Sequence, residues 1–103
     1  MSEASSWFVY MVRSADGRLY TGVTTDPERR LSEHRQAGEN ANARGAKYFR
    51  GKKGLQMVFK NPATNRSMAQ KLEYKIKQLE KSQKESVVNG MLRLEELFPE
   101  MFE

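Results

Sequence analysis

Six consecutive apolar or aromatic residues near the start of the chain, Trp7 to Val12, constrain the fold more than any other part of the sequence. A short run that is apolar on both sides and rich in strand formers predicts a β-strand buried on both faces, and so a central strand. A turn signal follows at Ser14 to Gly17, and Leu19 to Thr24 again has strand composition. Together these segments predict a β-hairpin.

The type of turn decides which side chains of this hairpin share a face. If Gly17 takes the left-handed position of a three-residue loop, Tyr10 lies opposite Gly22, and Tyr20 lies on the same face as Tyr10. A two-residue loop shifts the register by one residue and puts the two tyrosines on opposite faces. Because glycine has no side chain, Gly22 is expected to leave open space above the sheet where a substrate can approach.

Helices account for most of the remaining predicted structure. Asp26 and Pro27 predict a helix start, with the aspartate as cap, and Gly38 predicts its end near Gln36 or Ala37. The later elements are expected to be a loop over 38–54, a strand over 55–59, a turn over 61–65, a helix capped by Ser67, a short helix from Ser82 through Val88, and an amphipathic segment over 91–98. This order of elements predicts one small α/β domain.

Composition limits the kinds of protein that the chain can be. A length of 103 residues suits a single domain, and no apolar run approaches the roughly 20 residues of a membrane span. The absence of cysteine excludes disulfides and thiolate metal sites, and the single histidine excludes a zinc site built from several histidines. The first residues lack the pattern of a secretory signal, so a cytoplasmic location is expected.

Positive charge is concentrated in one part of the sequence. The net charge is +5, and the stretch from Asn40 to Leu72 contains no acidic residue. It carries basic residues at Arg44, Lys47, Arg50, Lys52, Lys53, Lys60, Arg66 and Lys71. Such a stretch beside aromatic Tyr48 and Phe49 suits a polyanion such as nucleic acid, although a solvated basic loop explains the charges equally well.

Two polar residues of the first predicted helix are candidates for chemistry. Arg30 and His34 stand four residues apart and therefore lie on one helix face. An arginine can bind a phosphate with two hydrogen bonds and stabilise the charge that builds up during hydrolysis. Taken alone, the pair fits a solvated helix face better than a reactive site.

Glu73 is the first acid after the basic stretch, and it lies beside the apolar row of the second predicted helix. Magnesium needs only one or two protein carboxylates, because water and substrate phosphate complete its ligands. A single glutamate on a basic surface can therefore hold this metal. The alternative is a salt bridge from Glu73 to Lys77, four residues later on the same helix.

The order of these residues resembles a known family. Phe8-Val9-Tyr10, then Tyr20-Thr21-Gly22, Arg30, His34 and Glu73 are similar to the motifs of the GIY-YIG nuclease domain. Within that family the chain resembles the YhbQ-like group of small stand-alone bacterial proteins, and the likeness runs from Trp7 to about Val88. Phe8 replaces the first glycine of the family motif and Thr21 replaces its central isoleucine; both are interpreted as packing changes.

The resemblance implies an α+β fold in which a three-stranded antiparallel sheet is flanked by helices, with the site on one sheet face. It also implies a metal-dependent endonuclease that hydrolyses DNA, with Mg²⁺, or alternatively Mn²⁺, on Glu73. Tyr10 would be the general base, which requires a phenol pKa well below its ordinary value of about 10. Tyr20 would orient Tyr10 or the water, Arg30 would bind the scissile phosphate, and His34 would help to position these groups or pass a proton.

The expected partner is DNA that is branched or flapped, as in repair or recombination, because no element offers a recognition helix for base edges. The predicted DNA contacts are Arg44, Lys47, Arg50, Lys52 and Lys53. Two alternatives remain open at this point: a module on the same fold that binds nucleic acid without cutting it, and a ribonuclease.

Overall fold

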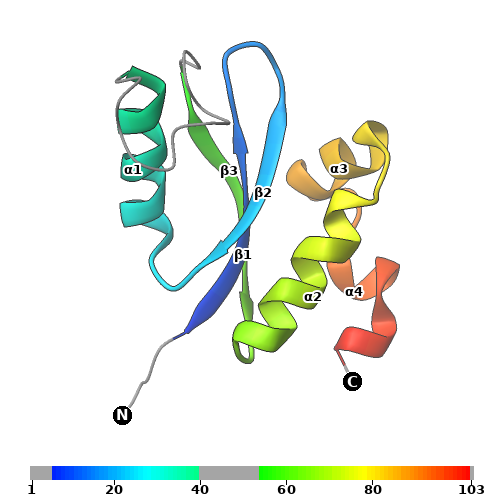
Figure 1. The fold of residues 1–103 in the computed structure, drawn as a ribbon. Helices are drawn as coiled ribbons and strands as arrows, with labels where there is room; N and C mark the ends of the chain where they lie inside the picture. The colour runs from blue at the N-terminus through cyan, green and yellow to red at the C-terminus, as the bar shows by residue number, and fades with distance from the viewer. Residues whose placement is uncertain (1–5, 40–53, 103) are drawn as a thin grey trace.

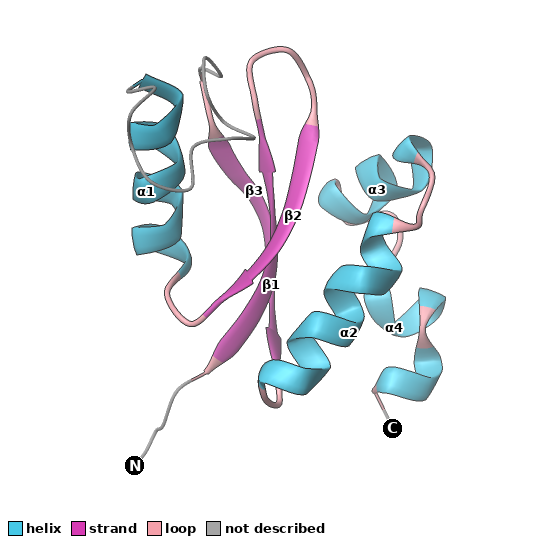
Figure 2. Cartoon of the chain, in the orientation of Figure 1, coloured by secondary structure: helices cyan, strands magenta, loops and turns pink. Residues whose placement is uncertain are grey.

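The computed structural model describes residues 6–39 and 54–102 of the chain. Three strands form one sheet, with helices on both faces (Figures 1 and 2). In chain order the elements are β1 (Trp7–Arg13), β2 (Leu19–Thr24), α1 (Pro27–Glu39), β3 (Gln56–Ala63), α2 (Arg66–Lys77), α3 (Lys81–Val88), α4 (Leu94–Leu97) and a short 3₁₀ turn, η1 (Pro99–Met101). The predicted α+β class is confirmed.

The sheet is antiparallel in the order β2-β1-β3, so β1 is the central strand, as its apolar run predicts. Gly17 has φ +87°, and the Ser14 N–H donates to the Arg18 carbonyl at 3.0 Å to close the three-residue loop. Tyr10 therefore pairs with Gly22. The predicted hairpin register is confirmed.

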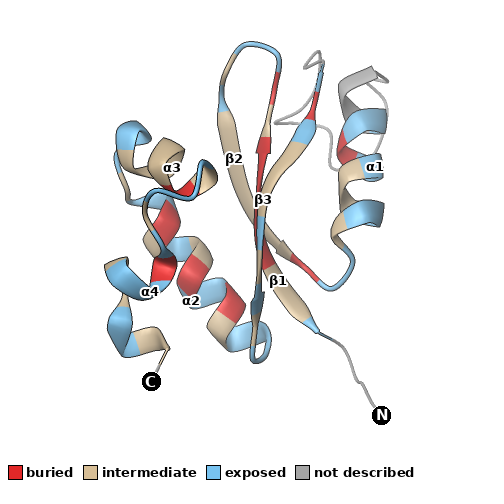
Figure 3. Cartoon of the chain, turned by 180° about the vertical axis from the view of Figure 1, so that it is seen from behind, coloured by how far each residue is buried: buried red, intermediate tan, exposed pale blue. Residues whose placement is uncertain are grey.

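Alternate residues of β1 point into two separate cores, one on each face of the sheet. Val9 and Met11 pack with α2, which contributes the fully buried Leu72 and Ile76. Figure 3 shows buried segments in red along β1 and α2. The helices of the C-terminal half lie on this face, and α1 lies on the other (Figure 1).

The second core is smaller and lies between the sheet and α1. Tyr10 and Val12 of β1 pack there with Leu55, and Leu31 of α1 covers them. Leu31 is the main apolar side chain that α1 offers, so the helix rests on the sheet partly through polar residues. Asp26 caps this helix by accepting from the Arg29 N–H at 3.1 Å, as predicted.

The third strand is longer than its composition predicts. It runs from Gln56 through Asn61 and Pro62 to Ala63, a stretch for which the sequence predicts a turn. Because β3 is an edge strand, one side of it forms no ladder, and a proline without an N–H is tolerated there. The prediction that the strand stops at Phe59 is wrong for this reason.

Helix ends differ from the predictions in three places. Helix α1 continues through Gly38 to Glu39 instead of ending before the glycine. The cap of α2 is Asn65, whose side chain accepts from the Met68 N–H, and the cap position of α3 is Glu80. Ser67 and the predicted cap at Ser82 lie instead inside α2 and α3, since the helices begin earlier than expected. The end of α3 at Asn89 and Gly90 is confirmed, with Gly90 at φ +84°.

Helix α3 is fastened to the sheet by a charged pair between residues far apart in the sequence. The Arg13 guanidinium at the end of β1 donates to both carboxylate oxygens of Glu85, at 2.7 and 2.6 Å. Lys81 of the same helix donates to the Gly17 carbonyl in the hairpin turn at 2.7 Å. These contacts hold α3 beside β2. Within the part of the chain that the structure describes, no helix is long and apolar enough to cross a membrane.

Candidate active site

The five residues that the sequence singles out for chemistry line a single cleft of about 450 Å³. They come from four elements: Tyr10 from β1, Tyr20 from β2, Arg30 and His34 from α1, and Glu73 from α2. The floor of the cleft is strand β2 from Leu19 to Val23. Residues separated by up to 63 positions in the sequence (73 minus 10) are thus brought to one place.

The cleft lies over the edge of the sheet rather than on one face, which corrects the expectation from the resemblance. Arg30 and His34 come from α1 on one face, and Glu73 comes from α2 on the opposite face. They meet because β2 is an edge strand with no further strand beside it in the described sheet. Helices α1 and α2 lie on opposite faces of the sheet (Figure 2), and residues from both helices line the cleft.

Tyr10 and His34 form a buried pair at the inner end of this cleft. The Tyr10 Oη and the His34 Nε2 are 2.8 Å apart, and the two residues are only 3% and 4% exposed. Burial, followed by the charge of Arg30, lowers the pKa of His34 to about 4. His34 is therefore neutral at pH 7, and its Nε2 can accept the proton of the Tyr10 hydroxyl.

The protonation of Tyr10 differs from what the general-base role requires. Burial raises the pKa of Tyr10 above its ordinary value of 10.0, and the opposing effect of the Arg30 guanidinium is smaller. The strongly lowered phenol pKa expected from the resemblance is not found in the protein without metal or substrate, because desolvation outweighs the effect of Arg30 on the Tyr10 pKa. Tyr10 keeps its proton, and the adjacent neutral His34 is the group that can receive it.

Gly22 both lines the cleft, as predicted, and makes room for Tyr10. A Cβ built on Gly22 would lie 2.5 Å from the Tyr10 Oη and 2.7 Å from its Cζ, far inside contact distance. The space that a side chain at this position would need is therefore occupied by the Tyr10 ring. The missing side chain lets the tyrosine lie flat across β2 and point toward His34.

Arg30 and Glu73 each have a counter-ion on their own helix. The Arg30 Nη1 lies 3.0 Å from Oε1 of Glu33, and Oε2 of Glu73 lies 3.2 Å from the Lys77 Nζ. The Glu73–Lys77 salt bridge, which the sequence offers as the alternative to a metal, is thus present. Its presence does not remove Glu73 from the cleft, because both residues line it.

The donor set of the cleft suits Mg²⁺ bound together with substrate. Among the described residues no group of three or more histidine, cysteine or acidic side chains is placed to hold a metal alone. Glu73, the one acid among the described residues that line the cleft, has a side chain 24% exposed and already holds a cation, the Lys77 ammonium. A carboxylate that accepts a cation and opens to solvent fits a metal that takes its other ligands from water and phosphate.

Two basic residues in the cleft were not assigned to the site from the sequence. Lys77 enters from α2 and Lys84 from α3. The spacing of four residues from Glu73 could have indicated Lys77, but nothing local relates Lys84 to the other site residues. The predicted DNA contacts Arg44, Lys47, Arg50, Lys52 and Lys53 lie outside the described residues.

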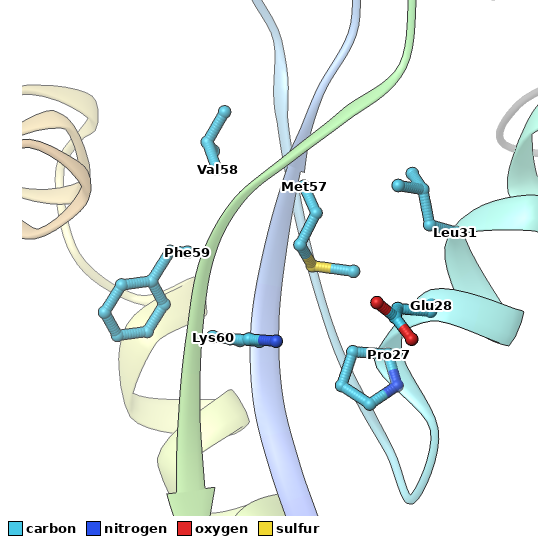
Figure 4. Close-up of a pocket in the computed structure, with 7 residues that line it drawn as sticks. All are labelled: Pro27, Glu28, Leu31, Met57, Val58, Phe59 and Lys60. Carbon is cyan, nitrogen blue, oxygen red and sulfur yellow. The ribbon is translucent and has the colours of Figure 1, made fainter.

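A second cleft, of about 420 Å³, lies between α1 and β3 and contains none of the predicted site residues. Figure 4 shows the side chain of Met57 of β3 pointing toward α1, with its end beside Glu28. Its lining is largely apolar, with Glu28 and Lys60 as the charged members. The groups suited to phosphodiester chemistry are therefore concentrated at the β2 edge.

Comparison with known proteins identifies a family domain that includes the residues of the β2 cleft. Residues 6–86, which include all five predicted site residues, match the GIY-YIG catalytic domain. The chain belongs to the GIY-YIG family. The matched part ends within α3, so α4 and η1 follow the GIY-YIG domain.

Relatives of this GIY-YIG protein include two bacterial sequences. UPF0213 protein YhbQ of Escherichia coli is 51% identical over 82 residues, which are 80% of this chain and 76% of that protein. A UPF0213 protein of Vibrio cholerae is 50% identical over 94 residues, which are 90% and 87% of the two chains.

Two solved structures are similar to this GIY-YIG protein. The solution NMR structure of a UPF0213 protein from Bacillus halodurans has a TM-score of 0.51 and 33% identity, and covers 88% of this chain and 90% of its own. The solution NMR structure of a protein from E. faecalis has a TM-score of 0.56 and 31% identity, and covers 88% and 91%.

Proposed function

We propose that this protein is a metal-dependent endonuclease that hydrolyses DNA phosphodiester bonds, preferentially in branched or flapped DNA. The observation that carries the proposal is the convergence of Tyr10, Tyr20, Arg30, His34 and Glu73 on one cleft. Positive charge from Arg30, Lys77 and Lys84 lines the same cleft and suits a phosphate.

A hydrolytic role explains the buried pair better than binding alone. A protein that only binds the nucleic acid backbone needs exposed cations, because the affinity comes from phosphate contacts. It has no use for a tyrosine and a histidine held 2.8 Å apart with both side chains almost fully buried. A neutral histidine next to a hydroxyl at the end of a basic cleft is an arrangement suited to proton transfer.

In the proposed reaction, the proton of the attacking water leaves through Tyr10 and His34. The Tyr10 oxygen takes the proton from water while the Tyr10 proton moves to the His34 Nε2, 2.8 Å away. This relay needs no preformed phenolate, which agrees with the raised pKa of Tyr10 and the low pKa of His34. A bound phosphate brings negative charge that favours the protonated His34 that results.

The other site residues hold the substrate and the metal. Arg30 binds the scissile phosphate, which replaces Glu33 as the partner of its guanidinium. Tyr20, which lines the cleft from β2, orients the attacking water. Glu73 is the residue that would hold Mg²⁺, or Mn²⁺ in its place, and the ion would supply charge stabilisation for the phosphate oxygens.

The shape of the site also bears on the substrate. The cleft lies at the sheet edge, between two helices, and its predicted contacts are to phosphates. Contacts to phosphates do not read the base sequence. The protein is therefore expected to select its substrates by the shape and deformability of the nucleic acid. Branched and flapped DNA present backbone in directions that a regular duplex does not.

The test uses purified protein with linear, nicked, flapped and four-way-branched DNA, and with RNA of matched structures. Each substrate is incubated with Mg²⁺, with Mn²⁺ and with EDTA. We expect metal-dependent cutting of the branched or flapped DNA, and cutting lower by several orders of magnitude for Glu73→Gln, since the metal contributes several kcal/mol. Glu73→Gln keeps the side-chain size, so melting temperature serves as the folding control.

The possible results separate the alternatives. DNA binding without cutting under any condition would establish the binding module instead. Preferential cutting of the RNA substrates would establish a ribonuclease. Undiminished cutting by Glu73→Gln would show that Glu73 does not hold the metal.

A further inference from the structure

Lys77 occupies the position at Glu73 that a metal ion would need. Its ammonium lies 3.2 Å from the Glu73 Oε2, and the side chains of Lys77 and Glu73 are 56% and 24% exposed, so the lysine is the more exposed partner. A dication that binds Glu73 must displace this ammonium or share the carboxylate with it at close range. Two positive centres on one carboxylate repel each other, and the monocation on a long flexible stem is the one that moves.

A displaced Lys77 has a second anion within the same cleft once a substrate is bound. Lys77 and Lys84 both line the cleft, and α3, which carries Lys84, is held beside β2 by the contacts of Arg13 and Lys81. Arg30 enters from the opposite helix layer. Because Arg30, Lys77 and Lys84 line the same cleft, a strand bound at Arg30 brings its neighbouring phosphates into the cleft with the two lysines.

On the basis of the proposed function, we propose that Lys77 exchanges partners during substrate binding. Without metal it neutralises Glu73, and with metal and nucleic acid bound it pairs, together with Lys84, with a phosphate next to the scissile one. Lys77 is a positioning residue in this scheme, since it does not touch the reacting atoms.

The exchange couples the two ligands. Metal alone has to displace Lys77 into solvent, whereas metal with nucleic acid releases it onto a phosphate. Binding of the metal therefore strengthens binding of the nucleic acid. By thermodynamic linkage, binding of the nucleic acid strengthens binding of the metal by the same factor. The protein is expected to bind metal weakly until a phosphate backbone is in the cleft.

The first experiment measures the affinity for Mn²⁺ without nucleic acid. The readout is the paramagnetic broadening of backbone amide NMR signals near the cleft, such as that of Gly22, as Mn²⁺ is added. Lys77→Met removes the charge and keeps much of the length of the side chain. We expect it to bind Mn²⁺ about three- to tenfold more tightly than the original protein, since one unit charge near the dication is removed. Lys71→Met, on the same helix outside the cleft, is the matched control and should change the affinity little.

The second measurement is DNA affinity in Ca²⁺, which supports binding in place of Mg²⁺, compared with affinity in EDTA. Lys77→Met should weaken DNA binding in Ca²⁺ and reduce its salt slope by about one, and should have a smaller effect in EDTA. Lys71→Met should have the same effect in both conditions. Melting temperatures of all variants establish that they are folded.

The outcomes distinguish this inference from the proposed function. If Glu73→Gln abolishes Mn²⁺ broadening while Lys77→Met leaves the Mn²⁺ affinity unchanged, the partner exchange is wrong and the metal site stands. If Glu73→Gln leaves the broadening intact, the metal assignment itself fails. Equal effects of Lys77→Met on DNA binding in Ca²⁺ and EDTA would also overturn the exchange.

Discussion

At the scale of single residues, the candidate site depends on one missing side chain. Tyr10 reaches His34 only because Gly22, its partner across the hairpin, leaves room for the ring. The ring in turn buries His34, and burial is the main cause of that histidine's low pKa. Three residues on three elements therefore form one unit.

Gly22→Ala is expected to break this unit. The added methyl group would lie 2.5 Å from the Tyr10 hydroxyl oxygen, so the ring must move away from His34. Overpacking of this kind costs about 1–3 kcal/mol, and each kcal/mol lowers the melting temperature by about 4–8 °C in a domain of this size. NMR titration of His34 should also show its pKa moving up from about 4 toward 6.5. An unchanged His34 titration with an unchanged melting temperature would contradict this packing.

His34 should also make folding stability depend on pH. Its pKa is lowered from 6.5 to about 4 on folding, so between these values the unfolded chain binds the proton and the folded chain does not. The contribution of neutral His34 is fully present above about pH 6.5 and is lost as the pH falls toward 4. The expected slope approaches about 1.4 kcal/mol per pH unit in this range.

The measurement is urea unfolding at pH 5 and pH 7 for the original protein and for His34→Gln, which cannot titrate. Other acids contribute equally to both proteins, so the difference between the two slopes isolates His34. Identical pH dependence in the two proteins would show that His34 is not buried in its neutral form.

At the scale of elements, α1 and α2 approach the site from opposite faces of the sheet, and the start of each helix is fixed by a polar cap. Asp26 caps α1, where sequence and structure agree. For α2 the sequence indicates Ser67, whereas the structure has Asn65 as the cap, with its Oδ1 2.9 Å from the Met68 N–H. The cap determines where α2 begins, and the start of the helix determines where Glu73 lies along it.

The two candidate caps of α2 can be told apart by a pair of variants. Asn65→Ala removes the acceptor of the Met68 N–H and should cost about 1 kcal/mol of stability. Ser67→Ala replaces an exposed residue inside the helix by a better helix former, so it should cost nothing or stabilise slightly. Denaturant unfolding of both variants is the measurement. A larger loss for Ser67→Ala than for Asn65→Ala would reverse the assignment.

The sequence predicts the elements well where local signals are strong and poorly where tertiary position decides. The apolar run of β1 and the Gly17 turn determine the central strand and the tyrosine register. The extension of β3 through Pro62 cannot be predicted locally, because the tolerance for proline comes from an edge position that no local pattern reveals. The five site residues follow from their family order, but the raised pKa of Tyr10 depends on burial, which only the packed structure shows.

At the scale of the whole molecule, an excess of positive charge accompanies a cleft suited to phosphate. The net charge of +5 includes the acid-free stretch between Asn40 and Leu72, most of whose first half lies outside the described residues. Arg30, Lys77 and Lys84, which line the cleft, are also among the positive charges of the chain. Nucleic acid binding should therefore depend strongly on ionic strength.

The contribution of the basic stretch is tested by replacing Lys47, Arg50, Lys52 and Lys53 together by alanine. If these residues bind phosphates, the DNA affinity of the variant falls and its salt slope becomes shallower, by about 0.9 for each phosphate that is no longer neutralised. Fluorescence anisotropy with duplex and branched DNA over a range of salt concentrations gives both quantities. Unchanged affinity and slope would identify the stretch as a solvated basic loop.

The placement of the site at the β2 edge has a consequence for the protein during its synthesis on the ribosome. Synthesis delivers Tyr10, Tyr20, Arg30 and His34 first, and Glu73 arrives only with α2, on the other layer of the sheet. On the proposed function, a nascent chain, or a fragment cut before Glu73, would hold the proposed proton relay and phosphate arginine but not the carboxylate proposed to bind the metal. The proposed cutting of nucleic acid would then begin only after translation has passed Glu73 and both layers have closed on the sheet.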